Sequence, residues 1–377
     1  MSLFVQSAQN SALLAYLQPQ TNPFEYNLKK NFTCFGKQKT VIIDGGTQAY
    51  GSCTRFALPR YGPLRRLTLR AEVTVTEDIT TDAFSILGAI ESVRITATGD
   101  RTVATQWGDT IADWVRSQPS ETRAVWLDGG HLRTGRDGTV LSAGTVAFDI
   151  PLPWSYTHSL QHTINARHTE PLEVCVRTSE SAAAWASPSS GVGNVTLHLY
   201  CEYIELALET EQRWLSIPHH PRLQWDVYRE TPVAVTTGDT QTIVPITCLN
   251  PTFRTLIICK SGNFSLDTRT TGSTQRIQLR HGDIDIVDST AAAVQVQMVT
   301  PPFRYHADSE VFALQFSETP DGTEQTGVAS FRNMVYPHII VHHASASTGQ
   351  SVQVYHYFHV LERTSLQDGV LRQRILS

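Results

Sequence analysis

The sequence predicts an all-β protein with two consecutive domains, and three observations lead to that prediction. Short runs in which apolar and polar side chains alternate recur from about residue 26, which is the pattern of half-buried strands. Turn signals rich in glycine and aspartate lie between the runs. The length of 377 residues suits two or three domains of about 150 residues, and a break in the pattern near the middle selects two.

Residues 1–25 precede these runs and differ from them. Their apolar side chains follow a loose helical spacing with almost no charge, and Pro19 and Pro23 end any helix. We interpret the segment as an N-terminal arm that docks on another surface, although a frayed terminus has the same pattern. A lysine group follows, which is either a solvated face or a face turned toward an acidic partner. It contains four of the five lysines, Lys29, Lys30, Lys37 and Lys39.

The first domain is predicted at residues 26–206. One helix is expected within it at 109–116, because Ile111 and Val115 share one side of that segment. The remaining pattern is of the strand type. The clearest alternating runs lie at 67–75, 92–97 and 195–206.

A linker is predicted at 207–225, followed by a second domain at 226–377. The linker contains Pro218-His219-His220-Pro221, which regular elements tolerate poorly. Many short strands with few helices indicate sandwiches or barrels, and each half is large enough for one eight-stranded jelly roll. Further strands of the second domain are predicted at 255–259, 294–299 and 311–316.

The composition indicates a surface that is not wholly exposed to water. Charged residues make up 17% of the chain, against about 25% in ordinary soluble domains. The hydrophobic content is an ordinary 41%, so the chain is expected to fold. We therefore expect large contacts between subunits. The net charge of −5 argues against a protein whose whole surface binds nucleic acid.

The sequence supports no catalytic, cofactor or metal site. It lacks a Walker-type loop, a G-x-G-x-x-G turn, an H-E-x-x-H helix and a G-x-S-x-G elbow, and its six cysteines form no C-x-x-C pair. Zinc binding would require two histidine groups to share one face of adjacent strands, and surface or interface histidines are the default interpretation. These groups are His338, His342 and His343 in one segment and His356 and His359 in the next.

Six short segments stand out by their order along the chain. They are a Pro-Arg-x-Gly stretch before a strand, a strand and glycine turn before the helix, a Pro-Leu-Pro-Trp stretch, the stretch around the linker, a Phe-Ala-Leu run with a later glycine and phenylalanine, and a C-terminal Tyr-Phe-His-Val-Leu run. The positions that define them are Pro59, Arg60, Gly62, Leu64, Trp114, Pro151, Leu152, Pro153, Tyr203, Leu206, Arg213, Phe312, Ala313, Leu314, Gly327, Phe331 and Leu361.

In this order the segments resemble the double jelly-roll major capsid proteins of nucleocytoplasmic large DNA viruses, a lineage that includes the adenovirus hexon. The chain departs from the family pattern at Pro63, where the family usually has aspartate. The resemblance implies two eight-stranded jelly-roll barrels with an N-terminal arm and a few short helices. It also implies that three chains form one capsomer, whose six barrels make a pseudo-hexagonal tile of an icosahedral shell.

The same resemblance implies a location in the virion and partners there. The partners are other copies of the chain, minor capsid or penton proteins, and an internal membrane near the arm, without recognition of a nucleic-acid sequence. No secretion leader and no run of about 18 apolar residues is evident, so assembly inside the infected cell is expected. The alternatives are a minor or turret-type capsid role, a receptor- or carbohydrate-binding β-sandwich of a virion, and a cupin-like enzyme.

Overall fold

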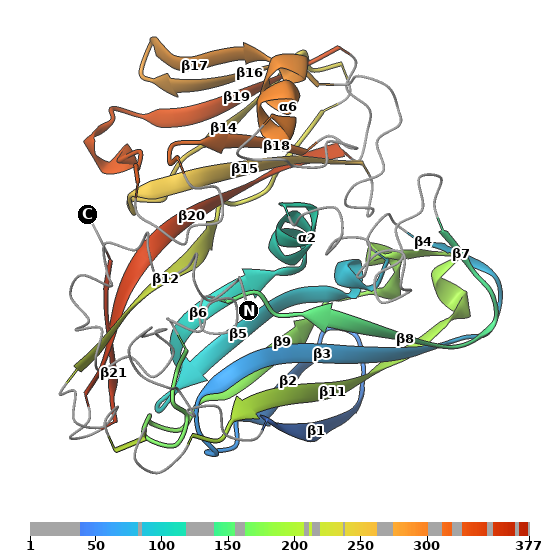
Figure 1. Cartoon of the computed structure of the whole chain (residues 1–377). Helices are drawn as coiled ribbons and strands as arrows, with labels where there is room; N and C mark the ends of the chain where they lie inside the picture. The colour runs from blue at the N-terminus through green and yellow to red at the C-terminus, as the bar shows by residue number, and fades with distance from the viewer. Residues whose placement is uncertain are drawn as a thin grey trace.

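The chain forms two β-barrels that lie one above the other in Figure 1. The predicted arm at 1–25, Lys29, Lys30, Lys37 and Arg213 lie outside the described residues. The computed structural model describes residues 38–81, 85–117, 139–154, 163–206, 211–212, 219–236, 238–261, 274–300, 311–318, 326–344, 350–365 and 369–375.

The first barrel consists of two four-stranded antiparallel sheets. One has the strand order β1-β11-β3-β8 and the other β2-β9-β5-β6, and a small sheet of order β10-β4-β7 extends one end. The strands are β1 (Gln38–Gln48), β2 (Cys53–Ala57), β3 (Leu64–Val75), β4 (Ile79–Thr81), β5 (Ile90–Ala97), β6 (Arg101–Trp107), β7 (Thr139–Leu141), β8 (Gly144–Pro151), β9 (Glu173–Thr178), β10 (Ala186–Ser187) and β11 (Val192–Ile204).

The second barrel repeats this plan. Its sheets have the orders β12-β20-β15-β18 and β14-β19-β16-β17, and β13 and β21 also pair with β20. The strands are β12 (His219–Arg229), β13 (Val233–Ala234), β14 (Gln241–Pro245), β15 (Thr252–Ser261), β16 (Thr274–His281), β17 (Ile284–Thr290), β18 (Val311–Gln315), β19 (Pro337–His343), β20 (Gln350–Ser365) and β21 (Leu371–Ile375).

The two barrels share one connectivity. In each, the first, eighth, third and sixth of the main strands form one sheet, and the second, seventh, fourth and fifth form the other. This is the jelly-roll arrangement, so the predicted pair of jelly rolls is confirmed. A helix joins the fifth and sixth main strands of each barrel, α2 (Gly108–Ser117) in the first and α6 (Ala291–Val299) in the second. The predicted helix at 109–116 corresponds to α2.

Alternation along the strands creates the core of the first barrel. On β3, Leu67, Leu69, Ala71 and Val73 point inward and are at most 1% exposed, while Thr68, Arg70 and Glu72 alternate with them. Burying such side chains is the main favourable contribution to folding, roughly 25 cal/mol for each Å² of apolar surface. The period of two therefore orients β3 within the barrel.

The segment 294–299 was predicted as a strand, and this prediction is wrong. It forms most of α6. The apolar–polar alternation of the segment suggests a strand, but three alanines precede it, and alanine is the strongest helix former. The Thr290 hydroxyl accepts a hydrogen bond from the Ala293 N–H at 3.2 Å and caps the helix. Val294 and Met298, one turn apart, then pack into the core.

The structure also differs from the prediction at the linker. Strand β12 begins at His219, inside the range 207–225 that was predicted as linker. Proline removes a backbone donor and is tolerated on edge strands. Pro221 lies on such a strand, because β12 pairs with β20 on one side only. The extent of the domains otherwise remains a prediction.

Candidate assembly site

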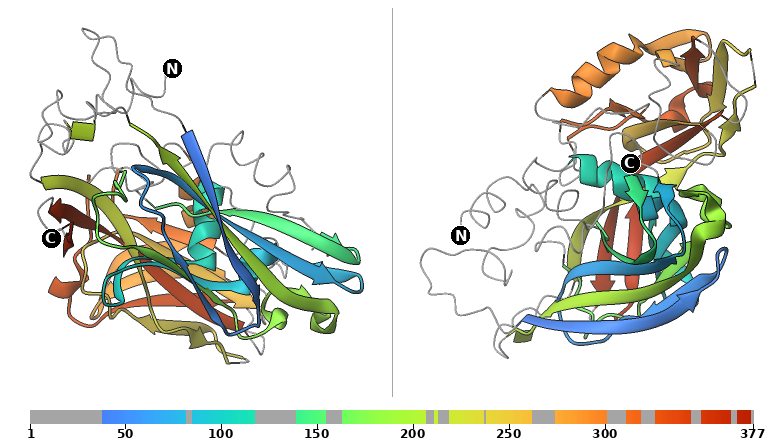
Figure 2. Two further views of the ribbon diagram at one scale, coloured as in Figure 1. Left: turned by 90° about the horizontal axis from the view of Figure 1, so that it is seen from below. Right: turned by 90° about the vertical axis from the view of Figure 1, so that its right-hand side faces the viewer.

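Helix α2 lies between the two barrels, whereas α6 lies on the outer side of the second barrel (Figure 2). Ile111 and Val115 of α2 are fully buried in the first barrel. Asp109 and Asp113 are one helical turn apart on another side, where they bind residues of the second barrel. The helix thus packs apolar side chains on its own barrel and presents two carboxylates to the next.

Asp113 accepts one bond from a cation and one from a phenol. Nη2 of Arg254, on β15, lies 2.8 Å from Oδ1, and the Tyr357 hydroxyl, on β20, lies 2.8 Å from Oδ2. The side chains of Arg254 and Asp113 are 7% and 2% exposed, so the pair is screened from water. Removal of one partner from such a pair leaves an uncompensated buried charge.

Asp109 repeats this arrangement. Its Oδ2 lies 2.7 Å from Nζ of Lys260 on β15 and accepts a hydrogen bond from the Tyr355 hydroxyl on β20. Burial alone would raise the pKa of the Asp109 carboxyl, but Lys260, Tyr355 and Arg229 together lower it below its ordinary value. Burial and the neighbouring carboxylate raise the pKa of the Tyr355 phenol, which stays protonated as a donor.

These six side chains form what we call the junction network. Their spacing follows from the geometry of a helix against a strand. Four residues of a helix rise about 6 Å, and two residues of a strand rise about 6.6 Å, so the two carboxylates match two phenols on β20. The network is Asp109, Asp113, Arg254, Lys260, Tyr355 and Tyr357.

A second contact joins β6 of the first barrel to β12 of the second. The backbone N–H of Thr105, on the edge strand β6, donates to Oδ1 of Asp226 at 2.8 Å. Burial raises the pKa of Asp226 to about 6, although this hydrogen bond and one from the Val227 N–H lower it. The guanidinium of Arg229 lies over the Trp107 ring, 4.8 Å from its centroid. Asp226 thus occupies the hydrogen-bonding edge of β6, which would otherwise be an open sheet edge.

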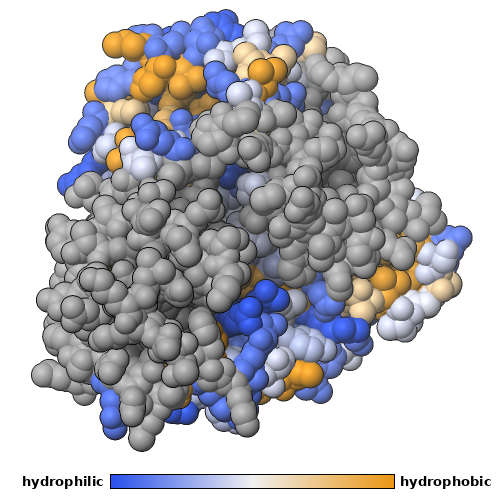
Figure 3. Space-filling view, viewed as in Figure 1, coloured by the Kyte–Doolittle hydropathy of each residue, from blue (hydrophilic) through white to orange (hydrophobic). Residues whose placement is uncertain are grey.

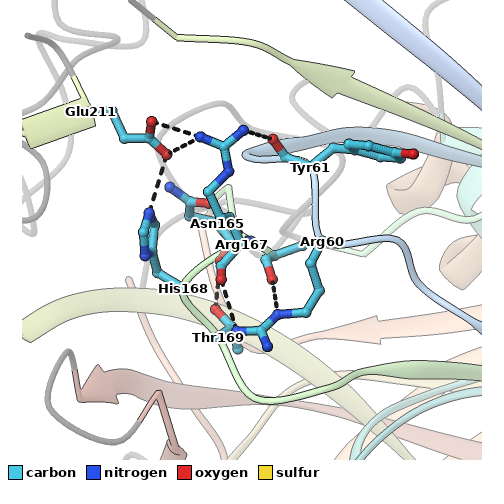
Figure 4. Close-up of polar contacts among 8 residues, drawn as sticks. Arg60, Tyr61, Asn165, Arg167, His168, Thr169 and Glu211 are labelled. Atoms are coloured by element: carbon cyan, nitrogen blue, oxygen red, sulfur yellow. Dashed lines mark hydrogen bonds and ion pairs between the residues drawn. The ribbon is translucent and has the colours of Figure 1, made fainter. Parts of the chain in front are cut away.

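The Pro-Arg-x-Gly segment lies between β2 and β3 of the first barrel, and its Arg60 belongs to a group of polar contacts that we call the linker cluster (Figure 4). The guanidinium of Arg60 donates to the carbonyls of Ala166 at 3.4 Å and Arg167 at 2.8 Å. Arg167 in turn donates from Nη1 to both carboxylate oxygens of Glu211, at 2.9 and 2.8 Å, and from Nη2 to the Tyr61 carbonyl at 3.0 Å. The linker cluster comprises Arg60, Tyr61, Asn165, Arg167, His168, Thr169 and Glu211.

The linker cluster ties the start of the linker to the first barrel. Nε2 of His168 lies 3.1 Å from Glu211, so this carboxylate contacts two basic side chains. Gly62 has a φ of +152°, and a Cβ there would lie 3.0 Å from the Ile204 carbonyl oxygen, which favours glycine. The residues of the Pro-Arg-x-Gly segment therefore have local structural roles, Arg60 as a donor to carbonyl groups and Gly62 at a position that favours glycine.

Most other positions of the family-like segments are packing positions. Leu152 and Trp154, at the end of β8, are 2% and 0% exposed. A Cβ at Gly327 would lie 2.4 Å from the Phe316 carbonyl oxygen, so only glycine fits there. The structure does not gather these positions into one site. Leu64, Pro151, Pro153, Tyr203, Phe312, Leu314 and Phe331 are buried, while Pro59, Trp114, Leu206, Ala313 and Leu361 are half-buried.

The two histidine groups lie on separate sheets. His338, His342 and His343 belong to β19, and His356 and His359 belong to β20, which pairs with other strands. Within the described part of the chain, no group of three histidine, cysteine or acidic residues is placed to hold a metal ion. Among the same residues, no helix is long and apolar enough to cross a membrane.

Exposed apolar side chains are concentrated on the second barrel, where Figure 3 shows a patch over β17. Ile284 and Ile286 of β17 are 67% and 46% exposed, and Val296 of α6 is 64% exposed. On the first barrel, Ile42 of β1 is 58% exposed. Such surface is unusual for a monomer and typical of contacts with other chains.

Sequence reasoning missed the junction network, although signals for it were present. Asp109 and Asp113 stand four apart in the predicted helix, away from its apolar side. Arg254 and Lys260 flank the segment 255–259, whose last four residues are a continuous apolar run, which is typical of a strand buried on both faces. The sequence pattern does not show how the two barrels pack against each other, so it could not bring these residues together.

No protein-family model matches the sequence, and no curated protein matches it. Solved structures match in fold. PBCV-1 VP54, fitted into a reconstruction of the virophage Sputnik, aligns over 93% of this chain and 100% of its own with a TM-score of 0.72 and 11% identity. The quasi-atomic model of the PBCV-1 capsid gives 0.72 over 93% and 99%, with 10% identity. The Faustovirus major capsid protein gives 0.60 over 93% of both chains, with 8% identity.

These alignments cover both barrels and the junction between them. The likeness lies in fold and connectivity, since about one residue in ten is identical. The two jelly rolls, in the same order and over nearly the full length of those chains, are therefore the common feature. The chain has the double jelly-roll fold of viral capsid proteins.

Proposed function

We propose that the chain is a viral major capsid protein that assembles as a homotrimer, with six barrels forming a pseudo-hexagonal capsomer of an icosahedral shell. The observation that carries this proposal is the pair of equivalent jelly rolls joined by a buried network. Such a junction makes the chain one block with two similar barrels. Three blocks arranged head to tail place six barrels in a ring.

The surface of the chain supports the same function. Contacts between permanent subunits are richer in apolar residues than other surfaces, and arginine is favoured over lysine in them. The exposed isoleucines of β17 and the low charge content of 17% agree with a surface of this kind. The work of the protein is then assembly and not catalysis, without a cofactor.

Within the virion, the expected partners beyond other copies are minor capsid or penton proteins and an internal membrane near the N-terminal arm. Assembly would take place inside the infected cell, without recognition of a nucleic-acid sequence. The similarity in fold to solved capsid proteins supports a structural role. The expected contact between the N-terminal arm and a membrane rests on the sequence alone.

Light scattering of the purified chain tests the proposal. Three chains of 41.9 kDa give a particle of about 126 kDa, or multiples of it if capsomers associate. A monomer at micromolar concentration would contradict the trimer and favour the carbohydrate- or receptor-binding alternative. Electron microscopy of the same sample should show particles with a hexagonal outline.

A further inference from the structure

Two connections at one end of the second barrel, β14–β15 and β18–β19, expose a group of large apolar side chains. Backbone hydrogen bonds of 2.8 Å in both directions between Thr252 and Ala329 hold the two connections side by side. The exposed fractions of the group range from 36% to 84%, and apolar side chains grouped on a surface indicate a contact with a partner. We call these four residues the turn patch: Leu249, Val328, Val335 and Tyr336.

The backbone holds the most exposed member of the turn patch in place. Tyr336 has a φ of +45°, a conformation that costs energy for a bulky residue, and it is 84% exposed. The residues on both sides of it are fixed by hydrogen bonds. The Gly282 N–H donates to the Val335 carbonyl at 2.7 Å, and the Ile246 N–H donates to the Pro337 carbonyl at 2.9 Å. A strained backbone that presents an aromatic side chain to solvent indicates a binding surface.

The connections that carry the turn patch have almost no charge. Among their described residues, 246–251 and 326–336, Arg332 is the only charged one. The equivalent connections of the first barrel, β2–β3 and β8–β9, contain the charged or basic residues Arg60, Arg167, His168 and Glu170. At this end, the first barrel therefore suits a charged partner and the second barrel an uncharged, apolar one.

The first barrel shows which part of a chain lies at this end. Glu211, in the linker that leads to β12, lies 2.8 Å from Arg167 and 3.1 Å from His168. The chain before the first strand of the second barrel thus contacts the β8–β9 connection of the preceding barrel. In the proposed ring of six barrels, the barrel that precedes the first one is the second barrel of another copy. By equivalence, the chain before β1 should contact the β18–β19 connection of that copy.

The N-terminal arm precedes β1 and matches the turn patch in character. Residues 1–24 contain no charged side chain, and Leu13 and Leu17 belong to the helical spacing of its apolar residues. A segment of this kind binds through its apolar side chains to exposed apolar groups. Residues 26–37, which separate the arm from β1, can span about 40 Å when extended, and a four-stranded sheet is about 20 Å wide. The arm is therefore long enough to reach a neighbouring barrel.

We propose that the N-terminal arm of one chain binds the turn patch of a second copy, at the end of the capsomer where the linker also lies. This inference rests on the proposed homotrimer and identifies the partner of the arm within it. Burial of the apolar side chains of the arm against Leu249 and Tyr336 stabilises the contact. Each copy gives one arm and receives one, so three arms connect three chains in a closed ring.

Photo-crosslinking of the full chain tests this contact. Tyr336 is replaced by p-benzoylphenylalanine, a photoreactive aromatic residue, and the trimer is irradiated. We expect a product of two chains, about 84 kDa, in which residue 336 is linked to a peptide from residues 1–25. A link to the arm of the same chain, which keeps the mass at 41.9 kDa, or to another segment overturns the inference. A lipid adduct that replaces the arm peptide when vesicles of phosphatidylcholine and phosphatidylserine are added also overturns it.

Limited proteolysis gives a second measurement that needs no crosslinker. The patch variant is Leu249→Asp with Tyr336→Asp, and aspartate tolerates the positive φ at position 336. Chymotrypsin should cleave the arm of this variant after Leu13 or Leu17 about tenfold faster than in the wild-type trimer, because a bound segment is cleaved only when it is released. The control is Thr98→Asp, an exposed residue at the equivalent end of the first barrel, which should leave the rate unchanged. Equal rates in the wild type and the patch variant would contradict the contact.

The result for the arm can be separated from the result for the proposed function. Circular dichroism checks that each variant is folded, and light scattering gives the oligomeric state of the wild type before either experiment. If the wild type is a monomer, the proposed function fails and the contact between copies fails with it. If the wild type is a trimer and residue 336 is not linked to the arm of another chain, only the inference about the arm is wrong.

Discussion

The sheets β1-β11-β3-β8 and β12-β20-β15-β18 have equivalent strand orders. Their outer faces differ in polarity and in exposure to solvent. The outer face of the first is polar and alternates with the core, as on β3. The outer face of the second is covered by α2 and β6, so β15 is buried on both faces, and its residues 256–259 form a continuous apolar run. The same strand connectivity therefore supports either an exposed polar outer face or a covered apolar one. Whether another barrel packs against that face determines which residues it requires.

The difference shows how a repeated fold becomes a directed building block. Two identical outer faces would let barrels associate in any order. Here the outer face of one sheet is covered within the chain through a buried charged network, whereas the outer face of the equivalent sheet carries partly exposed ion pairs such as Arg70–Glu72. Four predictions test this comparison, from the largest expected effect to the smallest.

Loss of a junction carboxylate should have the largest effect. Asp113→Ala leaves the Arg254 guanidinium buried without its partner, and we expect a loss of about 3–5 kcal/mol in the free energy of unfolding. Guanidinium chloride unfolding, followed by tryptophan fluorescence, measures it. The control is Asp288→Ala, which breaks a pair with Arg276 whose side chains are 36% and 45% exposed. That loss should be much smaller, because solvent screens an exposed ion pair, and equal losses would remove the distinction between the two sites.

Truncation of the covered outer face should come next. Leu256, fully buried on β15, is paired in register with Tyr355, so it faces the first barrel. Leu256→Ala should cost about 2–5 kcal/mol in unfolding free energy, because it removes apolar contact and leaves a cavity. Thr74→Ala, on the exposed face of β3, should cost less than about 1 kcal/mol. A small effect at Leu256 would show that the barrels are not tightly packed on each other.

Asp226 and Asp109, two carboxyl groups between the barrels, should contribute to the free energy of unfolding with opposite pH dependence. The folded state raises the pKa of Asp226 from 3.8 to about 6, so its contribution to stability is complete below pH 3.8 and is lost as the pH rises through 6. At two pKa units this loss is at most about 3 kcal/mol. The pKa of Asp109 is lowered, so its contribution is present above pH 3.8 and is lost as the pH falls through the folded value.

Two asparagine variants separate these effects. Asp226→Asn should flatten the decrease in unfolding free energy between pH 4 and 7, while Asp109→Asn should flatten the acid side below pH 4. Unfolding midpoints at a series of pH values are the measurement. An unchanged profile in Asp226→Asn would mean that this carboxyl titrates normally in the folded chain.

The linker cluster should have the smallest effect, since it holds the linker to one barrel only. Glu211→Gln keeps the shape of the side chain but removes the charge that Arg167 and His168 contact. We expect a loss of about 1.5–3 kcal/mol at most, the range of hydrogen bonds to a charged group. The control is Glu180→Gln on the exposed surface, which should leave the unfolding midpoint unchanged. If Glu211→Gln matched Asp113→Ala, the linker would matter as much as the junction.

Local pattern predicted much of the fold. The alternation on β3, β5 and β11 placed their inward side chains correctly, because burial of one face imposes a period of two. The same rule failed at 294–299, where an apolar–polar alternation lies in a helix. In that segment the three alanines and the Thr290 cap outweighed the alternation, and the buried positions repeat at helical spacing. Short alternating runs are therefore weak evidence when strong helix formers precede them.

The sequence alone determined the class of the protein, its two barrels and the order of its family-like segments, because these depend on local spacing and on residues near each other in the chain. Only the tertiary structure decided that Asp109 and Asp113 meet Lys260 and Arg254, since about 140 residues or more separate the partners. It also decided which of two equivalent sheets is covered and which helix is left open. Those properties arise from the packing of one barrel on the other, and no period along the chain records it.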